Sequence, residues 1–328
     1  TYIENYNSPQ SISRRNNFMA PSYLVDKAMI IRAVVQRDLD NVSPIIDKTY
    51  FITNGNLAEY KNKTVISIIT SPENLFDPEI GIYVTGNQFQ EWKNSLEFNP
   101  DKNPWDTDNK CNYFGEGKKW EREASISFFN KGKLFLQEKI GISLKGSSTR
   151  NNAGKSFKIK SKEDNFSSKL IIPENSDKNG EIINKYSSLG LRCVYDEGRL
   201  RDRFAQETLK NRELSSQIMN DAILFLDGEY WGFYQIMEKF DAEYFENHYG
   251  VSQKDVSVIK ENDLKDGKEE DLKEYLDFID EYSKKDLTDD NNYKKVEDYI
   301  DFNSLIEHYA AGIYLGIADW PNHNTGVW

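Results

Sequence analysis

The sequence is poor in the residues that build disulfide frameworks and zinc sites, with only two cysteines and three histidines among 328 residues. Cys111 and Cys193 are too few for a disulfide scaffold, although a single bridge between them stays open. His248, His308 and His323 have neither zinc-ligand spacing nor a Ser-His-Asp partner set. We therefore expect no zinc centre or serine-hydrolase triad, and assign His248 and His308 to helix surfaces or packing.

Positive charge and long apolar runs are also lacking. The chain has 42 Lys and Arg against 54 Asp and Glu, a net charge of −12, which repels phosphate backbones and anionic lipid. The most apolar stretch, residues 218–236, is interrupted by polar and acidic side chains before it reaches the roughly 18 residues of a membrane helix. We expect neither a nucleic-acid partner nor a membrane span.

The chain ends suggest a piece of a longer protein. It begins at Thr1 without an initiator Met or a signal segment and closes at Trp328, two residues after a glycine, so we interpret it as an excised fragment. Its length predicts one large domain with a smaller partner. Aromatic residues at 13 %, with 19 Tyr and six Trp, favour a groove or a carbohydrate-binding face.

The first fifty residues contain two runs of strand character, MIIRAVV (29–35) and TYFIT (49–53). They predict that residues 1–53 are the C-terminal part of a small β-sandwich. The turn sequence Asn54-Gly55-Asn56 places a domain boundary near residues 54–63.

The middle of the chain is predicted to be rich in β-structure. A new strand begins at 64–70, and residues 72–119 are rich in Pro and Gly and read as loops, with short regular pieces at 81–84 and 89–95. Period-two alternation and one hairpin signature, Asp227-Gly228, predict an antiparallel sheet. Its remaining expected strands are 124–129, 139–144, 156–160, 222–226 and 231–237, with one amphipathic helix at 200–214.

The last third of the chain changes to a helical period. The expected helices are 242–249, 271–285, 292–299 and 302–315, and residues 260–270 are expected to form a charged connector. A β-rich part followed by a helical part predicts an α+β, bilobal fold, with a first lobe at about 120–240 and a second at 241–328.

The strongest chemical signal lies in the last ten residues. Asp319-Trp320-Pro321-Asn322-His323-Asn324 follows an apolar helix, and Pro321 prevents the helix from continuing. An Asp five residues before an Asn has the spacing of the protein-kinase catalytic loop, in which the Asp accepts the substrate proton and the Asn holds a metal ion. An Asx-rich turn that caps a helix is the alternative explanation.

A second candidate is the polar loop GSSTRNNAGKSFKIK (146–160). The backbone and hydroxyl groups of Gly146, Ser147 and Ser148 are suited to cradling phosphates, and Lys155 or Lys158 to neutralising them. The sequence matches neither the G-x-G-x-x-G nor the Walker pattern. A polar hairpin with solvated lysines remains the alternative.

Two further positions carry weaker signals. Glu238, where a strand leads into a helix, is suited to fixing a ribose or a cation, or to pairing with a neighbouring Lys or Arg. Asp202 suits the first turn of its helix, and Arg201 is placed to reach a phosphate. Helix capping with surface ion pairs is the alternative explanation, and it applies more to Arg203 than to Arg201.

Taken together, these segments resemble the CotH family, the spore-coat-protein-H-like atypical protein kinases. The matching stretches occur in order from residue 64 to residue 328, and a collinear set is far more specific than any one motif. They are TVISIITSPENLFDPEIGIYVTG (64–86), WEREASISFF (120–129), IGISLKGSSTRNNAGKSFKIK (140–160), LRDRFAQETL (200–209), DGEYWGFYQIMEKFD (227–241), HYGV (248–251) and ADWPNHNTGVW (318–328). The resemblance sets the family domain at residues 64–328.

The resemblance implies a kinase-like fold that transfers the γ-phosphoryl of ATP to Ser or Thr of a protein, with Mg²⁺, Mn²⁺ or Ca²⁺. Asp319 would be the catalytic Asp and Asn324 the metal-binding Asn. Lys155 or Lys158 would pair with phosphate, and Lys155 is preferred because it adjoins the loop.

Four more residues stand at motif positions of the family: Arg150, Arg201, Asp202 and Glu238. In kinases a second metal-binding Asp follows some twenty residues past the catalytic loop, which would lie past Trp328. The resemblance therefore leaves the activity of residues 1–328 by themselves open.

An alternative function is an inactive kinase-shaped module at a surface, in which Tyr230, Trp231 and Trp320 bind glycan or a partner protein. The leading β-sandwich and the family favour a secreted, cell-surface or spore-surface location. The expected partner of the active form is a protein substrate rich in Ser and Thr.

Overall fold

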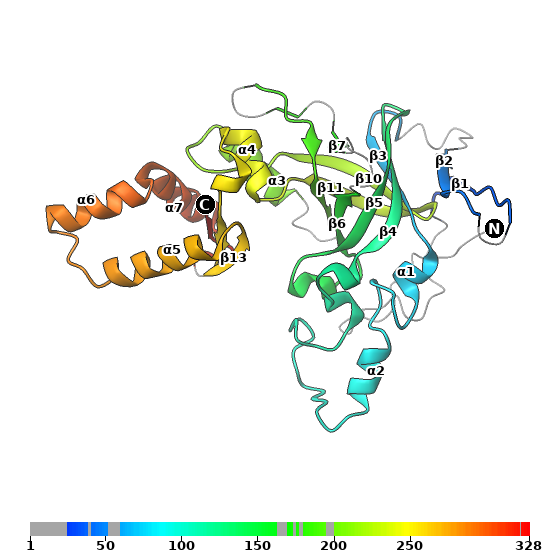
Figure 1. Cartoon of the computed structure of the whole chain (residues 1–328), viewed down its shortest axis with the longest axis horizontal. Helices are drawn as coiled ribbons and strands as arrows, with labels where there is room; N and C mark the ends of the chain where they lie inside the picture. The colour runs from blue at the N-terminus through cyan, green and yellow to red at the C-terminus, as the bar shows by residue number, and fades with distance from the viewer. Residues whose placement is uncertain are drawn as a thin grey trace. The chain divides into compact units, whose positions relative to one another are not determined.

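The computed structural model describes residues 25–38, 41–51, 60–162, 169–172, 175–176, 180–194, 200–321 and 323–328. These residues form two compact units. The first holds the described residues up to 171 together with residues 185–194 and 220–237, and the second holds those of 172–184 together with residues 200–219 and 238–328. Figure 1 draws the elements of both units and labels many of them, and the predicted α+β class is confirmed.

The first unit is built on a closed barrel of seven strands. Its order around the barrel is β10-β11-β9-β6-β5-β4-β3. The strands are β3 (Thr64–Ile69), β4 (Arg122–Asn130), β5 (Lys133–Lys145), β6 (Ser156–Ser161), β9 (Ser188–Cys193), β10 (Met219–Leu226) and β11 (Glu229–Met237). The predicted antiparallel pairing is confirmed from β3 through β4 and β5 to β6. β9, a strand that was not predicted, pairs antiparallel with both β6 and β11. The barrel closes through a pairing that was not predicted, because β10 runs parallel to β3 with Ala222 opposite Thr64.

The barrel interior follows from the alternation in the sequence. In β6, Phe157 and Ile159 are fully buried, whereas Lys158 between them is only half-buried, as expected for a strand with one face on the core. The predicted hairpin turn is confirmed at Asp227 and Gly228, which have φ angles of 48° and 83°. Both residues thus adopt the left-handed conformation that such two-residue turns require.

The loop-rich segment after β3 packs onto the barrel as short helical pieces. They are α1 (Pro72–Phe76), α2 (Asn87–Lys93), η2 (Asn112–Phe114) and η3 (Lys118–Trp120). Tyr113 in η2 is fully buried. No disulfide joins Cys111 and Cys193 in the structure, so the bridge that the sequence left open is not formed.

Residues 25–51 contact the barrel directly. β1 (Met29–Ala33) and β2 (Ile46–Tyr50) form an antiparallel pair. The buried Asp47 carboxylate accepts hydrogen bonds from Arg32 Nε at 2.7 Å and from Ser125 Oγ of β4 at 2.6 Å. Thr49 and Ser67 share a buried hydrogen bond of 2.8 Å. Assignment of this hairpin to a β-sandwich stays a prediction, and the predicted turn at 54–56 lies outside the described residues.

The helices of the second unit largely match the prediction. They are α3 (Arg201–Leu209), α4 (Ala242–Tyr249), α5 (Glu269–Tyr282), α6 (Asp290–Tyr299) and α7 (Phe302–Leu315). α3 ends five residues before the predicted Leu214. Asp241, Asp289 and Asp301 cap α4, α6 and α7, because each carboxylate accepts backbone N–H groups of the first turn. In the described part of the chain, no helix is both long and apolar enough to cross a membrane.

The charged connector predicted at 260–270 was wrong, because part of it forms strands. β12 (Val258–Lys260) and β13 (Asp263–Asp266) form a hairpin, and β14 (Gly326–Val327) pairs with the other edge of β12. The strands are too short for alternation to reveal them. A pair β7 (Leu170–Ile171) and β8 (Lys185–Tyr186) was likewise not predicted.

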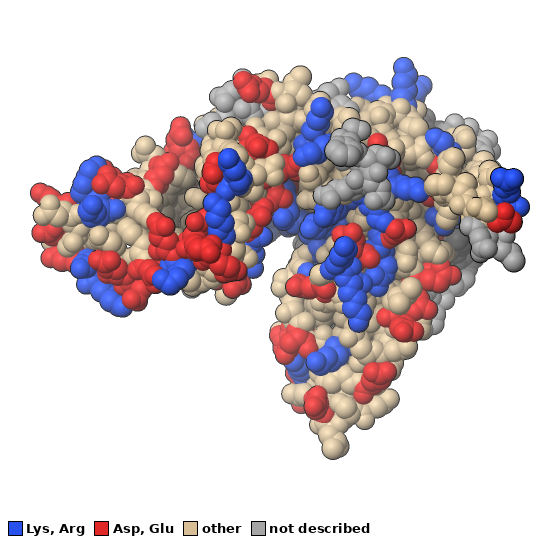
Figure 2. Space-filling view, viewed as in Figure 1, with Lys and Arg blue, Asp and Glu red and all other residues tan. Residues whose placement is uncertain are grey.

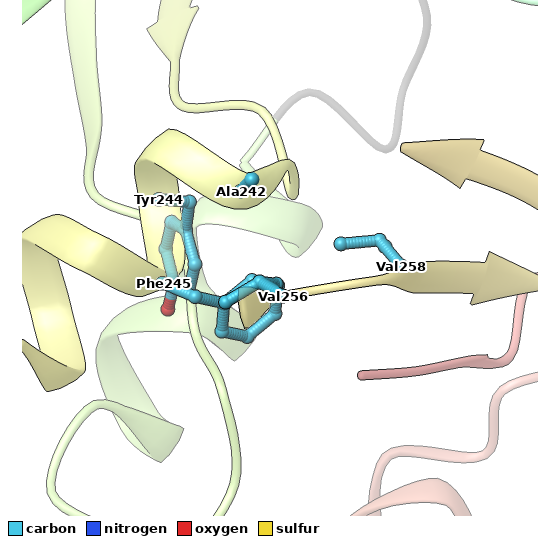
Figure 3. Packing of buried hydrophobic residues seen from close by; sticks show 5 residues of the cluster. All are labelled: Ala242, Tyr244, Phe245, Val256 and Val258. Atoms are coloured by element: carbon cyan, nitrogen blue, oxygen red, sulfur yellow. The ribbon is translucent and has the colours of Figure 1, made fainter. Parts of the chain in front are cut away.

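A small apolar core supports this three-stranded sheet. It consists of Ala242, Tyr244, Phe245, Val256 and Val258, drawn as sticks in Figure 3. Trp328, directly after β14, stacks on Phe245 with ring centres 4.3 Å apart. The segment after residue 324 is therefore anchored to α4 and β12.

Candidate active site

The loop that carries Asp319 begins where α7 ends. Gly316 has a left-handed φ of 62° and ends the helix, as is common for glycine at this position. Trp320 then lies flat across the helix at Gly312, where a Cβ would come within 2.8 Å of the indole carbons. The indole Nε1 donates a 2.9 Å hydrogen bond to His308 Nε2. The absence of a Cβ at Gly312 and the hydrogen bond to His308 thus fix the start of the loop.

Asp319 and Asn324, which the sequence singled out, meet in the structure. Asn324 Nδ2 donates to Asp319 Oδ2 at 3.4 Å, and the His323 N–H donates to the Asp319 carbonyl at 2.9 Å. Asn324 takes a left-handed φ of 62°, which Asn tolerates better than most residues. Both side chains are exposed, so the pair is open to a ligand.

Two residues that sequence reasoning missed complete this cluster. Lys260 Nζ donates to Asn324 Oδ1 at 2.9 Å. Glu261 accepts the Asn324 backbone N–H at 2.5 Å through Oε1, and this bond, as the largest cause, lowers the pKa of the Glu261 carboxyl. In the sequence, Lys260 and Glu261 directly follow residues 256–259. That position does not predict a contact with a residue more than sixty positions further along the chain.

The donor atoms of this cluster suit a hard divalent cation. Asp319 and Asn324 offer a carboxylate and a carboxamide oxygen, and Mg²⁺ is commonly held by one or two such groups together with substrate phosphates and water. The Asn324 oxygen is already in contact with a cationic group, the Lys260 ammonium. Within the described residues, no cluster of three or more His, Cys, Asp or Glu suited to a metal occurs.

The predicted phosphate loop is held firmly in the first unit. Arg150 donates from Nε to the Gly146 carbonyl at 2.6 Å, and its NH1 lies 3.3 Å from the carbonyls of Phe114 and Gly115. Tyr113 donates to Asn151 Oδ1 at 3.0 Å. Arg150 therefore ties the loop to the segment before it.

The tip of this loop remains at the surface. Gly146 has a φ of 113°, which only glycine adopts readily, and Ser147 is exposed while Ser148 is half-buried. Asn151 Nδ2 is buried and has no hydrogen-bond partner among the described residues. A buried donor without a partner is uncommon and is consistent with a ligand at this loop.

Lys155 is 1 % exposed, which is unusual for a lysine. Its ammonium donates to the carbonyls of Arg150 at 2.6 Å and Asn152 at 2.8 Å. It also lies 4.2 Å from the Tyr113 ring centre and 5.3 Å from that of Tyr83, and burial lowers the Lys155 pKa to about 7. Lys155 thus holds the loop from inside and has almost no surface to offer a phosphate.

Lys158 lies on the outer face of the barrel. The register places it opposite Ser143 of β5 and Gly190 of β9. The aliphatic chain of Lys145 covers Gly190, where a Cβ would approach Lys145 Cε to 2.8 Å. Lys145 was not singled out from the sequence, although it directly precedes Gly146. The two lysines therefore share one face of the sheet beside the loop.

More cationic and polar groups belong to the same face. Lys160 and Arg192 follow the same alternation and are exposed, and Figure 2 shows Lys and Arg side chains gathered over the barrel. Gln235, opposite Arg192, is buried and its Oε1 has no partner among the described residues. This basic face, defined by Lys145, Lys158, Lys160 and Arg192, is suited to an anion.

Glu238 is buried in the second unit and its carboxylate is engaged there. It accepts the Ile218 N–H at 2.8 Å, and His248 Nε2 lies 3.0 and 3.1 Å from its two oxygens. Tyr244 stacks on the His248 ring at 4.1 Å. The partner is thus a histidine rather than the Lys or Arg considered from the sequence, and binding of a ribose by Glu238 stays a prediction.

Arg201 and Asp202 lie in the first turn of α3, as predicted. Arg201 is exposed and Asp202 is half-buried. After α3, Arg212 forms a bidentate pair with Glu307 of α7, at 2.8 and 2.6 Å. The supporting roles of Arg201 and Asp202 stay predictions.

The predicted site residues fall into two sets. Those of the phosphate loop and β6 belong to the first unit, and Asp319, Asn324, Glu238, Arg201 and Asp202 belong to the second.

The aromatic residues considered for glycan binding are used in packing. Tyr230 contacts Phe225 and Tyr60, Trp231 contacts Tyr83, and Trp320 contacts Tyr309.

The sequence model of the family described as CotH kinase protein matches residues 142–328, more than half of the chain. The match includes the phosphate loop, β6, α3 and the Asp319 loop. A search of curated proteins returned no match.

Proposed function

The chain belongs to the CotH family, and on that premise we propose that it is a metal-dependent kinase, transferring the γ-phosphoryl of ATP to Ser or Thr of a protein. The observation that carries the proposal is the contact between the Asp319 carboxylate and the Asn324 carboxamide, on a loop fixed by Trp320. Their spacing and residue types are those of a kinase catalytic loop.

The two residues have different roles in the proposed reaction. The Asp319 carboxylate accepts the proton of the substrate hydroxyl as the hydroxyl oxygen attacks the γ-phosphorus, and the bond between the γ-phosphorus and the bridging oxygen of the β-phosphate breaks, so that ADP leaves. Asn324 would hold a divalent cation, Mg²⁺ or its substitutes Mn²⁺ and Ca²⁺, through Oδ1. When bound, this cation neutralises charge on the phosphates.

For the phosphates of ATP we assign Lys158 and Lys145 of the basic face rather than Lys155. The burial of Lys155 and its two carbonyl acceptors argue against direct contact with phosphate. Lys158 lies opposite Gly190 and Lys145 covers Gly190, beside the Gly146 loop. In the described part of the chain, the buried Asn151 Nδ2 of this loop has no hydrogen-bond partner. Gly146, Ser147 and Ser148 contribute the loop, with Arg150 holding its shape.

The proposal extends to the architecture and the setting. We assign the barrel unit as the nucleotide lobe and the helical unit as the substrate lobe of a bilobal kinase fold. The expected partner is a Ser/Thr-rich protein, and the expected location is secreted, at a cell surface or at a spore surface.

The test is phosphoryl transfer from γ-labelled ATP, using the full-length gene product that contains these residues, a panel of Mg²⁺, Mn²⁺ and Ca²⁺, and a Ser-rich acceptor. We expect label in the wild type and a loss of at least about 10³-fold in Asp319→Ala. Asp277→Ala is the matched control, because Asp277 is an exposed aspartate on α5 that pairs with Lys273.

The same assay distinguishes the role of Lys158 from that of Lys155. Lys158→Met should raise the KM for ATP, whereas Lys155→Met should act mainly through stability. No label from folded wild-type protein would contradict the kinase assignment and favour the inactive surface module.

A further inference from the structure

Lys260 holds the oxygen that the proposed metal ion needs. Its ammonium is 2.9 Å from Asn324 Oδ1, the atom assigned above to the cation. An ammonium and a divalent ion around one carboxamide oxygen would repel each other at a few ångströms. Both cations therefore compete for one ligand.

The fold makes this contact specific. β12 ends at Lys260, and its pairing with β14 places Lys260 opposite Gly326, two residues after Asn324. Glu261, next in the chain, has a left-handed φ of 53° in the β12–β13 turn and binds the Asn324 N–H. The hairpin thus positions both an ammonium and a carboxylate at one asparagine.

Glu261 also gives the ammonium a second acceptor. Lys260 Nζ lies 3.7 Å from Glu261 Oε1, so a small rotation of the lysine chain exchanges the carboxamide for the carboxylate. The Lys260 side chain is 43 % exposed and has room to move. The lysine can leave Asn324 without losing an ionic partner.

We propose that Lys260 is a positioning residue of the metal site, a built-in competitor whose ammonium holds Asn324 Oδ1 until a divalent cation displaces it toward Glu261. The inference rests on the proposed metal role of Asn324. This competition lowers the affinity of the site for a divalent cation below the affinity that its ligands alone would give. A higher cation concentration is therefore needed to occupy it.

The test is Mn²⁺ binding to the chain without nucleotide. Paramagnetic broadening of the amide signals of Asp319, His323 and Asn324 reports the site, and the free Mn²⁺ signal in electron paramagnetic resonance gives the affinity. We expect Lys260→Met to bind Mn²⁺ about tenfold more tightly than the wild type, and Lys260→Arg to show no gain, because it keeps the cation.

The matched control is Lys265→Met. Lys265 belongs to the same hairpin, has a side chain 45 % exposed, and pairs with Asp263 at 3.3 Å rather than with Asn324. It makes the same change in net charge, so a general electrostatic effect would appear equally in both variants. We expect at most about a twofold gain from Lys265→Met.

Asn324→Ala separates the inference from the proposed function. If Asn324→Ala abolishes the broadening while Lys260→Met binds no more tightly than Lys265→Met, Asn324 is a metal ligand and the competition is disproved. If Mn²⁺ broadens these signals neither in the wild type nor in Lys260→Met, both the metal site and the competition are overturned.

Discussion

The two loops assigned to chemistry are held in opposite ways. The loop after Gly146 is fastened from inside by a fully buried lysine and by tyrosines of a neighbouring segment. The loop after Asp319 is exposed, and its polar contacts to Lys260 and Glu261 lie at the surface. A loop that only offers a fixed surface to phosphates gains from rigidity, whereas a loop that must exchange a metal ion and a proton needs groups that can move.

The same contrast extends to the surroundings of each loop. Barrel strands such as β3 are buried along almost their whole length. In contrast, almost no residue of α5 or α7 is fully buried. We therefore expect substitutions near the first loop to change stability strongly, and those near the second to change it little.

The largest expected effect is on the buried side of this comparison. Lys155→Ala removes the ammonium from two carbonyls and leaves a cavity between Tyr83 and Tyr113, so the free energy of unfolding should fall by about 3–5 kcal/mol. Urea denaturation measures it. Lys160→Ala, an exposed lysine on β6 five residues further along the chain, should change it by less than about 0.5 kcal/mol; equal losses would refute the internal role of Lys155.

A second buried group should make the barrel sensitive to pH. Burial raises the Asp227 pKa to about 7, although the Thr70 N–H donates to its carboxylate. Because this value lies above the unfolded value of 3.8, the folded state binds the extra proton, and the stability this provides is lost as pH rises through about 7.

Asp227→Asn removes this loss and keeps a residue that tolerates the left-handed turn. It should be more stable than the wild type by about 2 kcal/mol at pH 8, with little gain near pH 4. Urea denaturation across this range is the measurement, and Asp263→Asn, an exposed aspartate, is the control. A gain that does not depend on pH would contradict the explanation.

Trp320 is half-buried, unlike its exposed neighbours in the Asp319 loop. Trp320→Phe removes the hydrogen bond to His308 and should cost about 1 kcal/mol at pH 7.5. Burial lowers the His308 pKa, so the neutral ring that accepts this bond is favoured in the folded state. That contribution is present above the ordinary pKa of 6.5 and is lost as pH falls through the lowered folded value.

The cost of Trp320→Phe should therefore shrink at acid pH, as followed by hydrogen exchange of α7 amides. An equal cost at pH 5 and pH 8 would show that only ring packing matters.

The smallest effect is expected on the outer helices. Lys273 and Asp277 form an exposed pair of 2.8 Å on α5, and such pairs contribute little in water. Lys273→Ala should leave the unfolding midpoint unchanged within error in the same urea experiment. A clear loss would mean that α5 depends on its surface charges, and would weaken the contrast between the two units.

Much of the fold is visible in the sequence because it is local. The alternation of β4, β5 and β6, the Asp227-Gly228 turn and the helix period of α4 and α7 are set by neighbouring residues, and the structure agrees with them. The closure of the barrel is not local, because β3 and β10 are far apart in the chain. No periodicity within either strand encodes that pairing.

The residues of the candidate site also fall into those that a local pattern predicts and those that only distant strand pairing brings together. The spacing of Asp319 and Asn324 is a local pattern, and the structure brings the two together. Lys260 is 64 residues from Asn324 and reaches it only through the pairing of β12 with β14. The alternation around Phe157 and Ile159 places Lys158 on the outer face. Lys155 was nevertheless preferred as the phosphate-pairing lysine, because it adjoins the loop.

The parallel pairing of β3 with β10 has a consequence for synthesis of the chain. β3 pairs with β4 on one side, but its other edge is completed only when Ala222–Leu226 have left the ribosome. At about 5–20 residues per second this takes roughly 10–30 s. During that time the segment Val65–Ile69 exposes an apolar strand edge, the kind of surface that recruits other chains. The delay between these two strands, rather than the strength of the finished barrel, sets how long the nascent protein is open to aggregation.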